Sequence, residues 1–251
     1  MYSVTQRIKV TKQPRGGYIK PKDFTETKLN DGINLNSNEN IHASLVGLAV
    51  DYLTRFMTGT PIEEAFHISL LGSELIQERK NAEKLLSKIK GLDDNSIISA
   101  CKAVGYDVCF RAGTLGYKPV QQIQPNTETI DNIRIMVNRC LSFWQKYGPV
   151  VVDGFTFEGG YTDIISSGDG DYLTKDTLWD LKVSKDAPKN KYTLQILIYY
   201  IMGCHSIHKE FQNIKKLGIF NPRLNSVYLL DIANISDETI QEVSSEVIGY
   251  Q

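Results

Sequence analysis

Cysteine is scarce in this chain, and its four copies are scattered at positions 101, 109, 140 and 204. No two of them are close enough to form the paired spacing of a zinc knuckle, so that kind of metal site is not expected. A disulfide framework is typical of small secreted domains, whereas 251 residues are enough to bury a core without one. Both points favour a reducing, cytoplasmic compartment.

Long apolar segments are also missing. The longest apolar run, residues 196–204, is about half of what a membrane-spanning helix needs. The first ten residues, MYSVTQRIKV, lack the apolar centre of a signal peptide. We therefore expect no membrane attachment.

The chain has almost no net charge, because 28 basic residues balance 29 acidic ones. No global charge points to a nucleic-acid partner, but a local basic groove stays open because the balancing acids can lie on another face. Hydrophobic residues make up 41% and charged residues 23%, which is ordinary for a soluble globular protein. No low-complexity tract indicates disorder.

Apolar periodicity divides the chain into a helical first half and an α/β second half. Residues 1–36 are expected to form an irregular arm with a short strand near residues 7–10. Helical spacing is found at residues 38–58, 61–91, 93–104, 127–147, 190–206 and 237–249. Short β-branched segments are found at residues 150–157, 160–166, 177–183 and 226–232. We predict a single domain over residues 1–251, with a helical segment of about residues 60–148 inserted between the first core helix and the sheet.

The segment TLWDLKVS, residues 177–184, carries two opposite charges inside an apolar strand. Side chains alternate along a strand, so Asp180 and Lys182 share one face. Burying both is costly unless something compensates. Two readings stay open: the solvated face of an edge strand, or a metal site in which the carboxylate is a ligand and the ammonium lies beside it.

The acid-x-lysine pattern occurs three times, at residues 26–28, 78–80 and 180–182, and only the last lies on a predicted strand. Upstream, the segment GGYTD ends in Asp163, within another apolar segment. The turn-like sequence SGDGD, residues 167–171, lies midway between them and predicts a hairpin that pairs Asp163 with Asp180. Two carboxylates held together repel each other, and aspartate oxygens suit a hard cation such as Mg²⁺ or Mn²⁺.

The helix predicted at residues 190–206 carries Gln195 and Tyr199 one turn apart on the same face. The tyrosine alone is explained by an amphipathic core. A glutamine on the apolar side of so hydrophobic a helix needs a hydrogen-bonding partner, which a phosphate or a water molecule on a metal could provide.

Taken in order, these motifs resemble the PD-(D/E)xK nuclease superfamily, in particular its RecB-like branch, which includes phage-type exonucleases. The motifs are Gly160-x-x-Asp163, Asp180-x-Lys182 and Gln195-x-x-x-Tyr199. The branch usually has a histidine on an early helix, and NENIHASLVGLAV offers His42. This chain departs from the pattern in two places: no glycine lies just before His42, and Thr162 replaces the proline of the family name. The resemblance covers residues 38–58 and 150–232.

The resemblance implies an α/β, restriction-endonuclease-like fold: a mixed central sheet flanked by helices, here with a helical insertion. It also implies a Mg²⁺- or Mn²⁺-dependent DNA nuclease, in which Asp163, Asp180 and the backbone carbonyl of Leu181 would ligate the metal and His42 would complete the ligand set. Lys182 would orient or deprotonate the attacking water, or neutralise the transition state. A lysine beside two acids stays charged, which favours the electrostatic role.

By the same resemblance, Gln195 and Tyr199 would contact the substrate backbone or support Lys182. Arg223, in the turn-like segment NPRLN, is a further phosphate-binding candidate. Some RecB-like relatives hold an iron–sulfur cluster with three late cysteines, but only Cys204 is late here, so no cluster is expected. The partner would be DNA, in phage recombination, repair or anti-phage defence, and the chain could act within a larger complex or a homo-oligomer.

Two other functions fit the same sequence. The scaffold could be a catalytically silent subunit that binds nucleic acid or protein, or a metal hydrolase that is not a nuclease. The lysines at positions 80, 84, 88 and 90 form a charge run among glutamates, which is either a solvated helix face or a ridge that contacts phosphates.

Overall fold

The computed structural model describes residues 1–251 and divides into two compact units. One unit comprises Met1–Asn30 and Trp144–Gln251 and holds a mixed sheet, and the other comprises Asp31–Phe143 and is helical. The boundary falls inside helix α8 (Thr127–Tyr147). The expected α/β architecture, with a mixed sheet flanked by helices, is confirmed. The helical unit begins at Asp31, ahead of the early helix, and not near residue 60.

The main sheet of the first unit has six strands in the order β2-β8-β7-β6-β5-β3. Only β6 and β7 are parallel neighbours, and every other pairing is antiparallel. The strands of this sheet are β2 (Thr25–Lys28), β3 (Val152–Phe155), β5 (Gly170–Leu173), β6 (Thr177–Leu181), β7 (Lys216–Asn221) and β8 (Ser226–Asp231). A separate parallel pair joins β1 (Tyr2–Ser3) to β4 (Ile165–Ser167).

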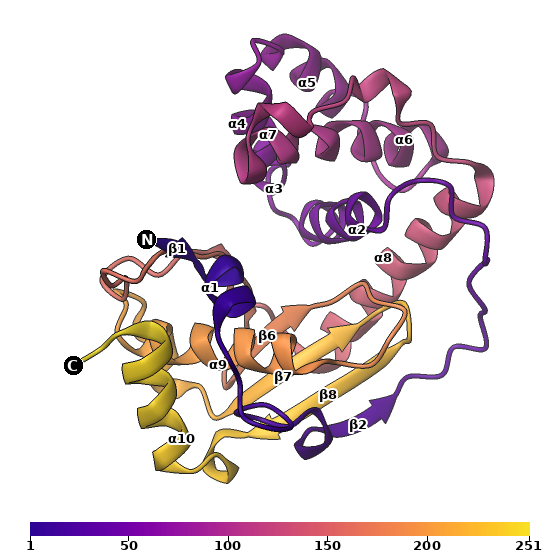
Figure 1. Ribbon diagram of the computed structural model, residues 1–251. Helices are drawn as coiled ribbons and strands as arrows, with labels where there is room; N and C mark the ends of the chain where they lie inside the picture. Colours follow the sequence, from indigo (N-terminus) through magenta and orange to yellow (C-terminus); the bar gives the residue numbers. More distant parts are fainter. The chain divides into compact units, whose positions relative to one another are not determined.

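Both faces of this sheet are covered. Helix α9 (Asn190–Cys204), which connects β6 to β7, lies along one face and shares a hydrophobic core with Leu178 (Figure 1). On the other face Trp179 meets the ring of Trp144 at 6.3 Å and the ring of Tyr147 at 5.5 Å, both from the end of α8. Because β6 lies inside the sheet and is covered on both sides, the edge-strand reading of its charges is wrong.

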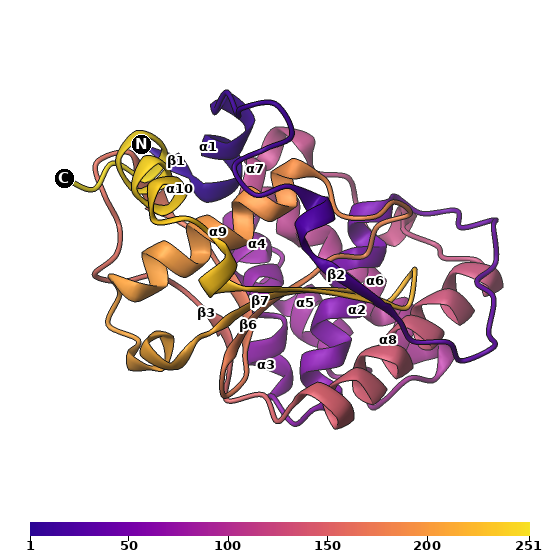
Figure 2. The same cartoon turned by 90° about the horizontal axis from the view of Figure 1, so that it is seen from below.

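The first residues form a helix, so the strand predicted near residues 7–10 is wrong. Ser3 caps helix α1 (Val4–Val10) in a reciprocal arrangement with Gln6, and the apolar residues one turn apart, Val4 and Ile8, are buried. Arg7 donates to the carbonyl of Val247 at 2.8 Å, which ties the start of the chain to its end. In both views the N-terminus lies beside α1, and the C-terminus follows the helical segment that begins with α10 (Asp237–Glu242; Figures 1 and 2).

Several short elements complete the sheet unit. They are the 3₁₀ turns η1 (Pro21–Asp23), η5 (Lys209–Asn213) and η6 (Ile232–Asn234), and the π-helical end η7 (Val243–Ile248). The predicted last helix over residues 237–249 corresponds to α10 and η7 together.

The helical unit packs short helices around buried residues such as Leu53, Phe66 and Ile133. Its α-helices are α2 (Ala43–Met57), α3 (Ile62–Ala65), α4 (His67–Leu75), α5 (Arg79–Leu86), α6 (Asp94–Ala103), α7 (Asp107–Ala112) and α8 up to Phe143, and its 3₁₀ turns are η2 (Val104–Tyr106), η3 (Thr114–Gly116) and η4 (Val120–Gln122). Asp93 caps α6 by accepting from the backbone N–H of Ser96.

Candidate active site

Asp180 and Lys182 form a buried ion pair at the end of β6. The Lys182 Nζ lies 2.6 Å from the Asp180 Oδ1, and the two side chains are 19% and 1% exposed. The backbone of Lys182 donates to the carbonyl of Phe220, so the parallel pairing with β7 continues one residue past the strand. The charged pair is therefore fixed by the sheet itself and not by a flexible loop.

The surroundings of Lys182 keep its ammonium charged. Burial alone would lower its pKa, but the negative charges of Asp180 and Asp171 outweigh burial and hold the pKa above its ordinary value. The ring of Tyr192 lies 5.5 Å from the Nζ and adds a cation–π contact. This agrees with the expectation that a lysine beside two acids stays protonated.

Asp163 does not pair with Asp180, and the hairpin predicted between them is wrong. The Thr162 hydroxyl accepts from the backbone N–H groups of Ile164 and Ile165 and donates to the carbonyl of Ile248 at 2.6 Å. These bonds fold the segment into a tight bend in which Asp163 is exposed, and the strand begins only after it.

The acid opposite Asp180 is Asp171, which sequence reasoning assigned to a turn. The β5–β6 hairpin pairs Tyr172 with Trp179 and Leu173 with Leu178, and the same register places Asp171 opposite Asp180. The Oδ2 of Asp171 accepts from the backbone N–H of Leu181 at 2.8 Å, which orients the carboxylate. The signal was present in the sequence, because residues 174–176 are a short polar stretch between two apolar runs.

Gln195 and Tyr199 do share a face of α9, and they bond to each other. The Gln195 amide donates to the Tyr199 hydroxyl at 2.8 Å, and Tyr199 is only 4% exposed. Burial, reinforced by the charges of Asp180 and Asp171, raises the pKa of the phenol well above its usual value. The phenol is therefore neutral and lies within the field of both acids.

His42 belongs to the helical unit, not to the unit that holds the two acids. It is the N-cap of α2, and its Nδ1 lies 2.7 Å from the Ser44 hydroxyl and 3.3 Å from the Ser44 backbone N–H. This local role explains the residue without a metal.

Arg223 lies in the turn between β7 and β8, at the end of the sheet where β6 also ends. Asn221 connects the two segments: its amide donates to the carbonyl of Ser184 at 2.8 Å, and its side-chain oxygen accepts from the backbone of Arg223 at 3.0 Å. The turn that carries Arg223 is thus fastened to the loop that follows Lys182.

The other two acid-x-lysine segments have structural explanations. Glu26 lies on the edge strand β2 and accepts from Ser226 and Tyr228 at 3.0 Å each. Glu78 precedes α5 and accepts from the Tyr106 hydroxyl at 2.7 Å. Neither is placed beside a second acid and a buried lysine as Asp180 is.

The oxygen atoms of Asp171, Asp180 and the Leu181 backbone suit a small divalent ion that keeps part of its water shell. No group of three or more His, Cys, Asp or Glu side chains in residues 1–251 lies close enough to hold a metal. The protein ligands on offer are the carboxylates of Asp171 and Asp180 and the carbonyl of Leu181. Mg²⁺ is commonly held by one or two carboxylates, with waters and substrate phosphates completing the octahedron, so these residues fit it.

Comparisons with protein-family models, curated proteins and solved structures gave no match. None of the helices combines the length and the apolar character needed to span a bilayer.

Proposed function

We propose that this chain is a metal-dependent DNA nuclease with a restriction-endonuclease-like core in its sheet unit. The observation that carries the proposal is the buried Asp180–Lys182 pair, whose atoms are 2.6 Å apart inside a six-stranded sheet. An isolated buried ion pair adds little to stability, which makes a functional role a better explanation of its presence. Asp171 and the Gln195–Tyr199 pair lie on the same face and supply the other groups that phosphodiester hydrolysis needs.

In this proposal Asp171, Asp180 and the Leu181 carbonyl hold Mg²⁺ or Mn²⁺. When bound, such an ion stabilises negative charge on a phosphate and lowers the pKa of a water molecule that attacks it. Asp171 takes the place that the sequence gave to Asp163. Its hydrogen bond from the Leu181 backbone fixes the orientation of the carboxylate beside Asp180.

Lys182 serves as a fixed positive charge. Its ammonium is held by Asp180 and by the ring of Tyr192, so it is in position before the substrate arrives. Charge grows on the phosphate oxygens in the transition state, and a preorganised donor of this kind contributes about 2–4 kcal/mol, or about 30- to 900-fold in rate.

The substrate backbone would be held by neighbouring polar and basic side chains. Gln195 can donate its second amide hydrogen while its first remains on Tyr199. The loop after Lys182 carries the exposed residues Lys185 and Lys189, and the first turn of α9 carries the exposed Lys191. Arg223 lies in the turn fastened to the same loop. Such residues bind phosphates without regard to base sequence.

The test is to incubate the purified chain with linear and circular DNA, single- and double-stranded, with Mg²⁺, Mn²⁺ or EDTA. Cleavage is expected only with the metals. Asp180→Asn and Asp171→Asn should abolish cleavage and remove Mn²⁺ binding in a calorimetric titration, because each removes one of the two carboxylates. Asp163→Asn is the matched control: the same chemical change at an exposed bend should leave both properties unchanged.

The outcomes separate the candidate functions. Full activity in Asp180→Asn and Asp171→Asn refutes the assignment. DNA binding without cleavage, and without Mn²⁺ binding, favours the catalytically silent subunit. Turnover of small phosphoesters with no salt-dependent affinity for DNA favours another kind of metal hydrolase.

A further inference from the structure

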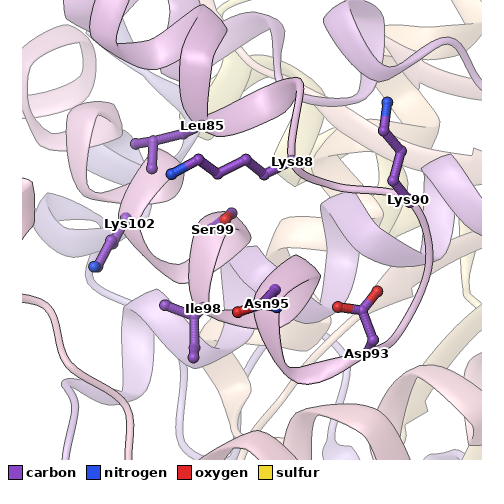
Figure 3. Close-up of a pocket in the computed structure, with 8 residues that line it drawn as sticks. All are labelled: Leu85, Lys88, Lys90, Asp93, Asn95, Ile98, Ser99 and Lys102. Carbon is purple, nitrogen blue, oxygen red and sulfur yellow. The ribbon is translucent and has the colours of Figure 1, made fainter.

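The helical unit contains a lysine-lined pocket at α5 and α6 that plays no part in the site described above. Its volume is about 570 Å³, and its polar lining includes Lys88, Lys90, Asp93, Asn95, Ser99 and Lys102. In Figure 3 the Lys88 side chain extends across the pocket toward Leu85, whereas Lys90 extends away from it. The pocket lies on the surface of the unit and is open to solvent on one side.

Three lysines and one carboxylate line this pocket, so its positive charge is only partly balanced. Lys88, Lys90 and Lys102 take part in no ion pair within residues 1–251. The carboxylate in the lining, Asp93, is engaged with Ser96, whose backbone and hydroxyl donate to it at 3.1 and 2.6 Å. By contrast, each arginine of the same unit has an acidic partner; they are Arg55, Arg79, Arg111, Arg134 and Arg139.

The backbone around the pocket is held in place before any ligand binds. Ser96 is fully buried, and its hydroxyl accepts from the backbone N–H of Lys90 at 2.9 Å. Ile89 and Ile97, which flank this contact in the sequence, are 2% and 0% exposed. The segment that carries Lys88 and Lys90 is thus anchored on α6, and only the lysine side chains must be ordered on binding.

We propose that this pocket binds the phosphate groups of a nucleic-acid strand. The inference rests on the proposed function, because it assigns a second contact for the same substrate. Lysine ammonium groups act as point charges that attract phosphates of any sequence. The neutral groups of Ser99 and Asn95 can donate hydrogen bonds to the same oxygens. The pocket is larger than one phosphate, and its open side with the exposed Lys88 and Lys90 allows a polymer to pass across it.

The test measures DNA affinity of the full chain in EDTA, where no cleavage takes place, by fluorescence anisotropy at several salt concentrations. The variant is Lys88→Gln with Lys102→Gln. The matched control is Lys80→Gln with Lys84→Gln, which removes the same charge from exposed positions of α5 outside the pocket lining. Each phosphate contact contributes about 0.7–0.9 to the steepness with which the logarithm of DNA affinity falls with the logarithm of salt concentration. Losing two contacts should therefore make this slope shallower by about 1.5 and weaken binding about 10- to 30-fold at 0.15 M salt.

A loss in the pocket variant, with the control within threefold of the parent, supports the inference. An equal loss in both variants, or none in either, overturns it. Lys88→Arg with Lys102→Arg keeps the charge and should retain the parent affinity, which separates loss of contact from misfolding. Inorganic phosphate is the probe for a small-anion site: phosphate binding that the pocket variant loses, with DNA affinity unchanged in that variant, overturns the role of a strand.

The result is independent of the nuclease assay. If the chain cleaves DNA but the pocket variant binds normally, only the pocket inference fails. If pocket-dependent binding is found without any cleavage, only the proposed nuclease activity fails.

Discussion

Removing Lys182 should destabilise the sheet unit far more than removing an exposed lysine with the same contact. Lys182→Met keeps most of the aliphatic stem but leaves the Asp180 carboxylate, 1% exposed, without the ammonium 2.6 Å away. Removing one partner of a buried pair typically costs about 3–5 kcal/mol. With a urea dependence of about 2 kcal/mol per molar, this corresponds to a fall of about 2 M in the unfolding midpoint.

Tryptophan fluorescence isolates the relevant unit. The chain has two tryptophans, Trp144 and Trp179, and both lie in the sheet unit, so urea unfolding followed by their emission reports that unit and not the helical one. The control is Lys189→Met. Lys189 also lies 2.6 Å from its aspartate, but the pair is 59% and 62% exposed, so its loss should leave the midpoint unchanged.

The double variant Asp180→Asn with Lys182→Met completes a thermodynamic cycle. Removing both charges should recover most of the stability lost in Lys182→Met, because no carboxylate is then left buried without its counter-charge. Mg²⁺ should stabilise Lys182→Met more than it stabilises the parent, since the ion can take over part of the role of the ammonium. A loss below about 1 kcal/mol in Lys182→Met would mean that the pair behaves like a solvated one, and would refute the reasoning from burial.

Three further outcomes are expected. Gly218→Ala should destabilise the sheet unit by about 1–3 kcal/mol and change its tryptophan emission, because an added Cβ would lie 2.3 Å from the Trp179 ring. An unchanged urea midpoint would contradict this expectation. The pKa of Lys182 is raised in the folded chain, so the stability that its charge contributes is complete below the ordinary pKa of 10.5. That stability is lost as pH rises through the higher folded pKa. The difference in unfolding free energy between the parent and Lys182→Met should therefore be constant from neutral pH to about pH 10 and shrink above it. Cys204 is exposed whereas the other three thiols are buried, and burial raises the pKa of Cys101 and Cys140 to about 12. A chromogenic disulfide reagent should therefore modify one thiol in the native chain and four in urea. Rapid reaction of a second thiol in the native chain would contradict the burial.

The elements predicted well from sequence are those set by local physical rules. Helix α9 and strand β8 lie within two residues of the predicted bounds, because each is a long apolar run with polar ends. The start of α6 was also predicted to within one residue, since a cap whose side chain bonds to the backbone three residues ahead depends on nothing farther away. The D/E-x-K pair belongs to the same group: two residues apart on a strand, Asp180 and Lys182 must share a face.

Two strands were predicted wrongly because they contain glycines that make room for an aromatic ring and do not form a turn. Gly170 was taken as part of a turn, yet it lies on β5 opposite Phe155, and a Cβ there would approach the phenyl ring to 2.3 Å. Gly218 has the same relation to Trp179 across β6 and β7, and the strand that contains it, β7, was not predicted at all. In both strands the glycine makes room for a large ring on its neighbour, a demand that only the folded sheet reveals.

The identity of the second acid depended on this misplaced turn. Face alternation along a strand is fixed by the backbone, but the residue that meets Asp180 across the hairpin is fixed by where the chain reverses. The reversal occurs at Thr174–Asp176, where the backbones of Thr174 and Thr177 bond at 3.0 Å, and this brings Asp171 opposite Asp180. Because the Leu181 N–H binds the Asp171 carboxylate, moving the reversal would break that bond as well as the acid pair. The paired Asp171→Asn and Asp163→Asn variants therefore test the hairpin register and the chemistry of the site in one experiment.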